Sequence, residues 1–487
     1  MLLTPDRSAL FADPWFAAAL AISVVLPAPG LAAGGEVAEA LVSAQAQSGL
    51  ALTLYQNDLA LVQDTRRVTL NKGANLLAWQ GLPARVQAET ALLRSTAGKS
   101  LTLLEQHYDL DLLTPQRLLE KSVGEPVRII RTHPTTGLDS SEYATVLAAS
   151  DGVVLKFVDR VETGVPGRLA FARVPAGLRE RPTLALRLDA GQAGPQELTL
   201  SYLTTGLGWR ADYVAELNAR GDRLDLVGWA TLSNTSGAVF RDARLQLVAG
   251  EVNRVTPDAR PVPLARAMLM AEAAPQPEAE PLADYYRYPL PRPISLDDQQ
   301  TKQVALLAAT ALPVRKEYVL RGAGYYYRGQ HGDLGATKAA VYVEFDNRGE
   351  GLAVPLPKGI VRVYVKDGDG AQFVGEDRID HTAKNETVRL KLGEAFDLSA
   401  EKKQTHFQQI ANYGGRGGVI ETAYQLELRN ARPEKVVVKV VEPLPGDWQI
   451  LSENLPHQQE NARTAVWSVP VPADGKTLLT WRVRVKY

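Results

Sequence analysis

The sequence contains no cysteine, and this absence removes several kinds of chemistry at once. Without thiols there is no disulfide, no cysteine nucleophile, no Cys-ligated zinc and no lipid-modified cysteine. The chain also lacks a large net charge, because it has 54 Lys and Arg residues and 55 Asp and Glu residues. Nucleic-acid binding begins with a basic surface that neutralises phosphates, so no nucleic acid is expected as a partner.

Long apolar runs are missing beyond the N-terminus, so no transmembrane helix is expected after signal removal. The chain has 487 residues, of which 45% are hydrophobic and 22% charged, as in ordinary globular proteins. This length exceeds that of a typical single domain, and it predicts two to four domains that each bury a core.

The N-terminus resembles a secretory signal. Trp15 to Leu26 is a short apolar run, and the small residues of Leu31-Ala32-Ala33-Gly34 follow it. Two aspartates outweigh the single arginine ahead of this run, which is unusual for a signal, and a buried N-terminal helix is the alternative. We predict that residues 1–33 are removed on export and that the mature protein is periplasmic or lies at the cell surface.

Short β-rich runs separated by Asn, Gly and Pro predict an all-β fold. We expect tandem β-sandwich domains of the immunoglobulin-like kind, a small inserted β-barrel-like domain, and few helices. The strands between Val127 and Phe171 are about five residues long, which suits a small closed barrel. Thr114-Pro115, followed by Gln116 to Lys121, predicts one short helix that is capped by the threonine.

Changes in composition and in strand pattern along the sequence predict six ranges. Pro, Ala and Glu dominate between Pro257 and Pro293, and this composition buries too little apolar surface to fold. The ranges are a signal peptide (1–33), an N-terminal β-sandwich domain (34–105), a small β-barrel-like domain (106–180), the first part of a further β-sandwich (181–256), a disordered linker (257–293) and a C-terminal β-sandwich region (294–487).

Several long motifs between residues 200 and 400 are similar to those of a known family. They are Tyr202 to Tyr213 (YLTTGLGWRADY), Gly228-Trp229-Ala230, Asn234 to Gly237, Asp242 to Leu245, Ala249-Gly250-Glu251-Val252, Leu356 to Tyr364 (LPKGIVRVY), Gly375 to Thr382 (GEDRIDHT) and Gly393 to Asp397 (GEAFD). Together they resemble a bacterial envelope family of unknown function that includes mucoidy inhibitor A-like proteins. The resemblance covers about 190–487 and implies a β-sandwich architecture outside the cytoplasm.

One departure from that family limits what the resemblance implies. Relatives of the mucoidy-inhibitor kind often carry a helical coiled-coil segment, and here the barrel-like range 106–180 stands in its place. A coiled-coil oligomerisation role is therefore not expected, and the sequence leaves the oligomeric state open.

No catalytic motif is visible in the sequence. A Gly-x-Ser-x-Gly sequence is missing, and the six histidines form neither a His-x-His nor a His-Glu-x-x-His pattern. Asp367 to Gly370 looks like the start of a calcium loop, but Ala371 and Gln372 stand where an EF-hand needs an oxygen ligand and then glycine. Its Asp-Gly pairs favour a hairpin turn, with a non-standard cation site as the alternative. We expect no enzymatic activity, cofactor or metal, although distant histidines that converge in space are an alternative.

Two segments are candidates for binding. The first holds Tyr325, Tyr326 and Tyr327 among glycines and ends with Arg328. Adjacent residues of a strand point to opposite faces, so at least one ring should be exposed to a glycan or a protein. An edge strand with a loop is the simpler interpretation of this segment.

The second candidate is the polar cluster of Asp377, Arg378, Asp380 and His381. These side chains form a binding site only if they converge. A turn in which they satisfy one another and the backbone is the simpler interpretation. Trp209 and Trp229 lie in strand contexts and are expected in the sandwich core.

The C-terminal residues 479–487 alternate apolar and polar side chains and end on an aromatic, as many outer-membrane barrels do. The same alternation suits a half-buried strand with Trp481, Val483, Val485 and Tyr487 on one face. We predict that this strand completes a C-terminal sandwich. The favoured hypothesis is a non-catalytic exported envelope protein that acts as a structural or interaction module for a protein or a glycan. A polysaccharide-acting enzyme and an outer-membrane barrel are the alternatives.

Overall fold

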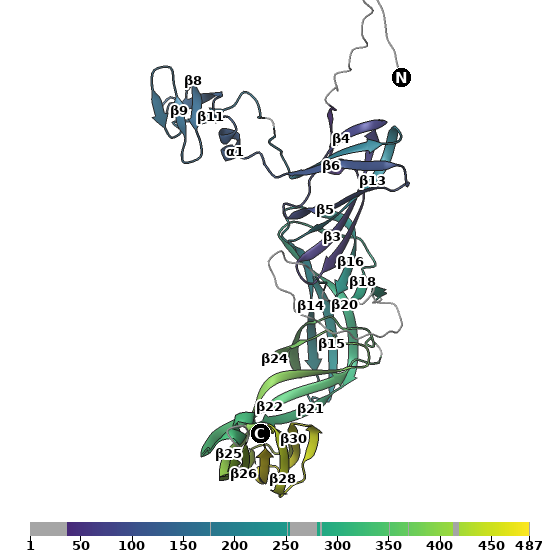
Figure 1. The fold of residues 1–487 in the computed structure, drawn as a ribbon, viewed down its shortest axis with the longest axis vertical. Coiled ribbons are helices and arrows are strands. Elements are labelled where there is room, and N and C mark those ends of the chain that lie inside the picture. The colour runs from purple at the N-terminus through teal and green to yellow at the C-terminus, as the bar shows by residue number, and fades with distance from the viewer. Residues whose placement is uncertain are drawn as a thin grey trace, which may run out of the picture. The chain divides into compact units, whose positions relative to one another are not determined.

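The structure, a computed structural model, describes residues 37–175, 177–250, 252–253, 280–282, 285–349, 351–368, 370–412 and 418–486. Within these ranges nearly all regular structure is β-strand, and the predicted all-β sandwich fold is confirmed (Figure 1). The predicted signal peptide lies outside the described residues. No helix in the described part of the chain is long and apolar enough to span a membrane.

Two sheets combine the first strands of the chain with strands from much later positions. Their orders are β1-β4-β12-β6 and β17-β18-β16-β2-β3-β13-β5, and β19 pairs with β16 outside the second order. The bounds are β1 Glu39–Val42, β2 Gln47–Tyr55, β3 Leu59–Leu70, β4 Gly73–Gln80, β5 Val86–Ser95, β6 Leu101–Asp109, β12 Thr183–Ala190, β13 Gly194–Thr204, β16 Phe240–Ala249, β17 Glu280–Leu282, β18 Tyr285–Pro289 and β19 Ile294–Leu296. A short 3₁₀ helix, η1, covers Ala44–Ala46.

The predicted ranges 34–105 and 181–256 are not separate domains. Strand β12 pairs with β4 and β6, and strand β13 pairs with β3 and β5. The predicted linker at 257–293 also ends too late, because β18 pairs with β16 from Gln246 to Ala249. Of that linker, residues 257–279, 283 and 284 lie outside the described residues. Alternation along the chain shows that a strand exists, but it does not show which distant strand will pair with it.

Between β6 and β12 the chain forms a small inserted domain with its own core. Helix α1, Pro115–Glu120, follows Thr114, whose hydroxyl accepts a hydrogen bond from the Arg117 N–H at 3.2 Å, as predicted. Leu119 of this helix packs against the sheet, whose order is β10-β9-β8-β7-β11. The strands are β7 Pro126–Thr132, β8 Asp139–Ala148, β9 Val154–Lys156, β10 Val161–Thr163 and β11 Arg168–Ala170.

The inserted domain is an open sheet, and the prediction of a closed barrel is wrong. Strands β10 and β11 lie at opposite edges of the described sheet and do not pair with each other. Each is three residues long. Two strands of this length offer too few ladder hydrogen bonds to close a barrel.

A fourth sheet belongs wholly to the part of the chain in which the family resemblance was found. Its order is β20-β15-β14-β23-β24, and β14 and β23 run parallel. The bounds are β14 Leu207–Leu217, β15 Arg223–Asn234, β20 Gln300–Pro313, β23 Gly359–Asp367 and β24 Gly370–Ile379. The predicted hairpin at Asp367 to Gly370 is confirmed, because Asp367 pairs with Gly370 and Gly368 has a positive φ of 57°.

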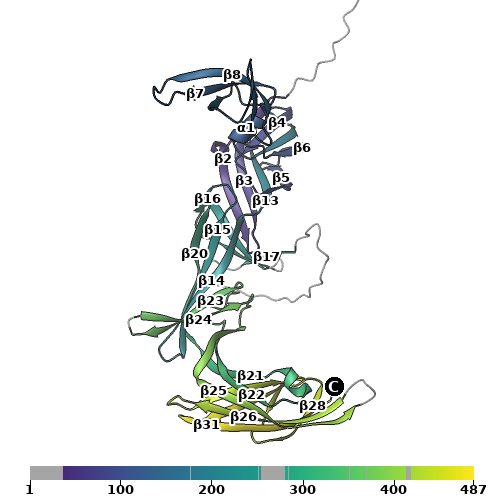
Figure 2. The same cartoon turned by 90° about the vertical axis from the view of Figure 1, so that its left-hand side faces the viewer.

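The last sheet has the order β28-β31-β26-β25-β22-β21-β27-β30-β29. Figure 2 shows β25, β26 and β31 running alongside one another. The bounds are β21 Arg315–Arg321, β22 Asp333–Asp346, β25 Thr387–Asn412, β26 Gly418–Asn430, β27 Val436–Pro443, β28 Asp447–Glu453, β29 Gln458–Asn461, β30 Thr464–Val471 and β31 Gly475–Lys486.

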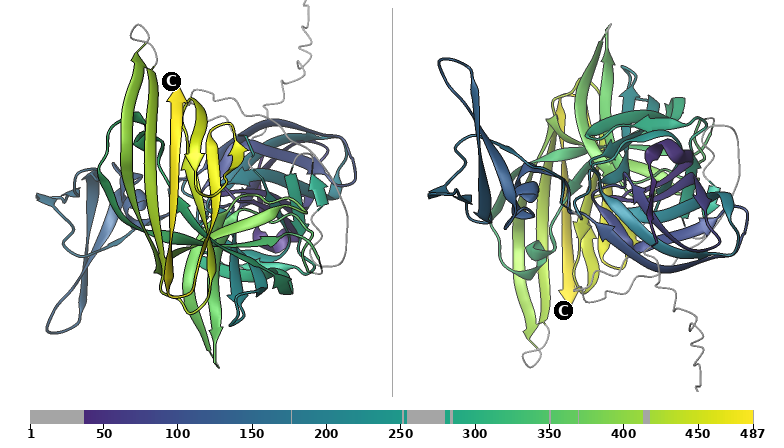
Figure 3. Two further views of the ribbon diagram at one scale, coloured as in Figure 1. Left: turned by 90° about the horizontal axis from the view of Figure 1, so that it is seen from below. Right: turned by 90° about the horizontal axis from the view of Figure 1, so that it is seen from above.

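Strand β31 completes this sheet as predicted. It pairs with β26 on one side and with β28 on the other, and Trp481, Val483 and Val485 are buried. Figure 3 shows the strand in yellow between its neighbours, with the C-terminal end marked. Tyr487, which was expected on the same face, lies outside the described residues.

Two long strands belong to both of the large hydrophobic cores. Val343 of β22 and Val388 of β25 pack into the core that also holds the first sheets. Ala339 of β22 and Leu398 of β25 pack into the core of the last sheet. The β22–β25 pair therefore links the two cores directly.

Candidate functional site

The polar residues at 377–381 do not form one site. The Asp377 carboxylate accepts hydrogen bonds from the Arg378 N–H at 2.8 Å and from the Lys391 N–H at 2.7 Å, which ties β24 to β25. The carbonyl oxygen of Asp380 accepts a hydrogen bond from the Thr382 hydroxyl at 2.9 Å. The Arg378 side chain is exposed, and His381 lies in different surroundings, described below.

The three adjacent tyrosines lie on a 3₁₀ helix, η2 Gly324–Arg328, and not on the edge strand favoured by the sequence. Tyr325 is 59% exposed and its ring meets that of His331 edge-on. Tyr327 is completely buried, and its hydroxyl donates to the Glu442 carboxylate at 2.7 Å. Arg328 at the end of the helix is exposed. The prediction that at least one ring is exposed is confirmed by Tyr325.

Tyr326 and Tyr327 help to enclose a buried ion pair. The Lys402 ammonium lies 2.7 Å from the Glu442 carboxylate and between 4.5 and 5.5 Å from the centroids of four aromatic rings. Burial lowers the pKa of Lys402, although the charge and hydrogen bond of Glu442 oppose this effect. The pair therefore lies in the core of the last sheet, away from the surface.

His381 borders a small apolar cleft, which we call the Tyr–His cleft. Its volume is about 190 Å³. The lining residues are Ala249, Gly250, Tyr286, Tyr288, Pro355, Leu356, Pro357, His381, Thr382 and Ala383.

Backbone hydrogen bonds fix the floor of the Tyr–His cleft. Leu356 and Thr382 exchange two N–H to carbonyl bonds at 2.8 and 2.9 Å. The hydroxyl of Tyr288 donates to the Pro355 carbonyl at 2.8 Å. The Lys358 N–H donates to Nδ1 of His381 at 3.3 Å, which in the neutral ring places the imidazole hydrogen on Nε2. The floor is therefore formed in advance of any ligand.

Buried aromatic residues support this floor from beneath. The hydroxyl of Tyr213 donates to the Pro357 carbonyl at 2.8 Å, and the indole N–H of Trp209 donates to the Val248 carbonyl at 3.1 Å. The rings of Trp209 and Tyr288 meet edge-on at 6.3 Å. Burial raises the pKa of Tyr213 and Tyr288 well above the ordinary value, so both hydroxyls stay protonated and keep donating.

Gly250 is required at the rim of the cleft. Its φ is +126°, which side chains of L-residues rarely adopt, and an added Cβ would lie 2.4 Å from the ring of Tyr285. The close approach of backbone and ring at this point is therefore available to glycine alone.

The cleft is suited to holding an apolar group. None of the described residues that line it carries a carboxylate, and their polar side chains are the imidazole of His381 and the hydroxyls of Tyr286, Tyr288 and Thr382. In the described part of the chain, no three His, Cys, Asp or Glu residues are close enough together to hold a metal ion.

Residues 198–487 match the model of a family described as Domain of unknown function (DUF4139). The chain belongs to this family. No curated protein matches the sequence. Every residue of the Tyr–His cleft falls within the DUF4139 region, whereas the inserted domain falls outside it.

Trp209 and Trp229 of the DUF4139 region have different environments. Trp209 is 3% exposed in the core, as predicted. Trp229 is half-buried and lies opposite Asp212 across β14 and β15, so it is on the outer face of the fourth sheet and the core prediction is wrong for it. A glycine precedes Trp229 in β15, and Tyr213 and Leu307 fill the inner side at that glycine.

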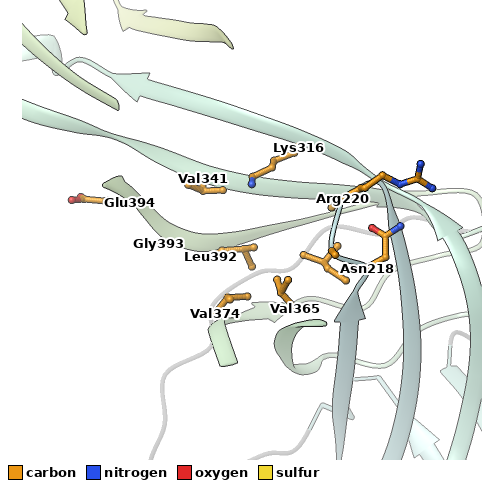
Figure 4. Close-up of a pocket in the computed structure, with 12 residues that line it drawn as sticks. Asn218, Arg220, Lys316, Val341, Val365, Val374, Leu392, Gly393 and Glu394 are labelled. Carbon is orange, nitrogen blue, oxygen red and sulfur yellow. The ribbon is translucent and has the colours of Figure 1, made fainter. Parts of the chain in front are cut away.

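A second cavity of the DUF4139 region lies where β22 and β25 pass between the two cores, and its volume is about 240 Å³. Figure 4 shows Val341, Val365, Val374 and Leu392 grouped along it, while the guanidinium of Arg220 points away. The apolar side chains of its lining adjoin the two large hydrophobic cores. A gap of this kind is expected where two strands, β22 and β25, connect the packed sheets.

Of the residues that line the cleft, His381 was predicted from the sequence as a candidate site residue, whereas Tyr286 and Tyr288 were not. Tyr286 and Tyr288 belong to Tyr285-Tyr286-Arg287-Tyr288, which falls inside the predicted linker. Disordered segments contain few aromatic residues, so three tyrosines in four residues could have indicated that this part of the predicted linker is folded.

Proposed function

We propose that this chain is an exported, non-catalytic protein of a bacterial envelope that binds a protein partner through the Tyr–His cleft. The proposal rests on the meeting of distant sequence segments at one cleft. Segments that led to the family resemblance, at 249–250, 356–357 and 381–382, come from distant parts of the sequence and meet at this cleft. A place among the mucoidy inhibitor A-like proteins is part of this proposal.

The lining of the cleft favours a protein partner over a glycan. Two tyrosines, two prolines and a leucine offer apolar contact, and about 190 Å³ is room for one apolar side chain. Aromatic-lined pockets that receive a single anchor residue are common at the centres of protein interfaces. A sugar would need more hydrogen-bond partners than this lining offers.

A blocking variant tests the binding site. Ala383 is an exposed residue of the cleft, so Ala383→Trp should fill the cleft without disturbing the core. Ala473→Trp adds the same side chain at an exposed turn elsewhere and is the control. In pull-downs from envelope fractions, one reproducible partner should be captured by the parent and the control and lost with Ala383→Trp. Capture that is equal for all three proteins would refute the cleft as the site.

Export is tested separately by intact-mass measurement of the protein from cell fractions. The apolar run and the small residues that follow it support cleavage near Ala33, so the envelope fraction should hold a chain that begins at about Gly34. A soluble cytoplasmic form that retains Met1 would contradict this part of the proposal and leave the cleft untouched.

A further inference from the structure

The inserted domain exposes an unusual amount of apolar surface. Of the 23 large hydrophobic side chains that are exposed among the described residues, ten lie between Leu110 and Val174. Val158 is fully exposed, Leu138 is 72% exposed and Tyr143 is 67% exposed. Apolar side chains gathered in this way mark a contact surface in soluble proteins.

The strand register places part of this apolar surface beside two cations. Tyr143 of β8 pairs with Arg128 of β7, and Thr145 of β8 pairs with Lys156 of β9. Side chains of paired residues share a face of the sheet. The alternate residues Val127, Val146 and Leu155 fill the domain core on the other face. Tyr143, Arg128 and Lys156 therefore lie together on the outer face.

Two turns of the inserted domain carry further exposed apolar side chains. Leu138 directly precedes β8, in the turn that joins it to β7. Val158 lies in the turn between β9 and β10, and Arg160 of that turn contacts the Glu142 carboxylate of β8 at 2.8 Å. The turn between β9 and β10 therefore lies beside Glu142 and Tyr143, whereas Leu138 lies at the start of β8, five residues before Tyr143.

The charge of this outer face is not balanced. Between residues 110 and 180 seven of the nine Lys and Arg side chains pair with a carboxylate, namely Arg117, Lys121, Arg131, Arg160, Arg168, Arg173 and Arg179. The remaining two are Arg128 and Lys156, which form no ion pair with any described residue. The two acids of β8 are already paired, because Glu142 contacts Arg160 at 2.8 Å and Asp139 contacts Arg168 at 2.7 Å. Two uncompensated positive charges therefore flank the exposed tyrosine.

We infer that this face binds the surface of an anionic phospholipid bilayer. Val158 enters between the headgroups, Tyr143 lies at the level of the interface, and Arg128 and Lys156 contact phosphates. Exposed aliphatic side chains on turns suit a fluid apolar layer, aromatic residues with a polar tip favour the interface, and cations are attracted to anionic headgroups. The face lies outside the DUF4139 region and is independent of the Tyr–His cleft.

Vesicle co-sedimentation tests the inference. The protein is the chain from Gly34 onward, which keeps every described residue and leaves out the apolar N-terminal run. It should sediment with phosphatidylglycerol-containing vesicles, less so as salt rises, and not with phosphatidylcholine vesicles. Arg128→Gln with Lys156→Gln should weaken binding about 30-fold, and Tyr143→Ser with Val158→Ser about tenfold.

Matched controls come from the same chain. Tyr325 is 59% exposed, so Tyr325→Ser balances the tyrosine change, and Arg321→Gln with Lys403→Gln removes two exposed cations elsewhere. Neither control should weaken binding. Equal loss in controls and test variants, or no sedimentation of the parent, would overturn the inference. Soluble polyglutamate that binds as tightly as the vesicles would also overturn it, in favour of an acidic polypeptide.

A gain-of-signal variant excludes misfolding as the cause of lost binding. In the full-length mature chain, Val158→Trp should show a blue-shifted emission on addition of phosphatidylglycerol vesicles, because the indole leaves water. An unchanged emission spectrum under conditions in which the parent sediments would contradict the proposed orientation of the face.

Discussion

At the scale of single residues, the buried Lys402–Glu442 pair is the most consequential contact of the last sheet. The two side chains are 9% and 2% exposed, and the Tyr327 hydroxyl also donates to Glu442. Removing one partner leaves an uncompensated charge in the core, which costs about 3–5 kcal/mol, whereas replacing both with apolar residues costs less. Glu442→Leu should therefore destabilise the protein more than Lys402→Met combined with Glu442→Leu, as measured by urea unfolding.

An exposed ion pair of the same sheet is the control for this prediction. Arg429 and Glu401 are 52% and 50% exposed and 3.2 Å apart. Exposed pairs are screened by water and contribute little, so Glu401→Leu should change the free energy of unfolding much less than Glu442→Leu. If Glu442→Leu were as mild as Glu401→Leu, the buried pair would have no special role.

Asp212, from the Trp-Arg-Ala-Asp-Tyr motif, predicts a pH dependence. Burial raises the pKa of Asp212, but hydrogen bonds from Thr231 and Arg362 and the charge of Arg210 outweigh it, so the pKa is lowered. A lowered folded-state pKa means that the carboxylate stabilises the fold above the unfolded pKa, about 3.9, and that this stability is lost as pH falls through the folded pKa.

Asp212→Asn should therefore reduce stability at neutral pH and have little effect in strong acid. The measurement is the free energy of unfolding of parent and variant from pH 7 to pH 2. Asp447→Asn, at an exposed position of β28, should leave the curve unchanged. Parallel curves for parent and Asp212→Asn would show that the ionised carboxylate contributes nothing.

At the scale of elements, strand β31 lies inside the last sheet between β26 and β28, and its removal should be severe. Trp481 and Val485 are at most 2% exposed, and burying each large side chain contributes about 1.5–3 kcal/mol. A chain truncated before Trp481 should lose cooperative thermal unfolding and aggregate in water. Truncation after Val485 keeps the buried residues and is the control. A soluble, cooperatively folding chain without Trp481 to Tyr487 would contradict this role of β31.

Sequence patterns predicted the positions of single strands and helices better than they predicted which strands pair with each other. The cap at Thr114, the hairpin at Asp367 to Gly370 and the alternation in β31 are local signals, and each was confirmed. The 3₁₀ helix at Gly324–Arg328 was missed because glycines on both sides permit several backbone conformations. The barrel was wrong because closure depends on strand edges that no local pattern shows.

At the scale of the whole molecule, the inserted domain should be removable. Leu113 and Arg179 are joined by a backbone hydrogen bond at 2.8 Å, so the two ends of the insertion meet. Its core shares no residue with the other described cores. Replacing residues 114–178 with a short Gly-Ser linker should leave the melting temperature of the remaining chain within a few degrees of the parent's. A large fall would show that the insertion supports the sheet of β6 and β12.

The Tyr–His cleft also depends on pairing between segments that are distant in the sequence. His381 and the 356–357 segment were visible as parts of motifs, but their meeting with Tyr286 depends on pairing between β16 and β18 and between Leu356 and Thr382. Such long-range pairing is not encoded in local alternation. The sequence therefore named one residue of the cleft, while the fold supplied the rest.

The most direct test of the proposed binding role is site-specific photo-crosslinking in living cells. A photoreactive phenylalanine analogue replaces Tyr286 in the Tyr–His cleft, and in a matched strain it replaces the exposed Tyr325. We predict that irradiation links the chain at position 286 to one envelope protein and yields no such product at position 325. The absence of an adduct at 286, or the same adducts at both positions, would contradict binding through the cleft.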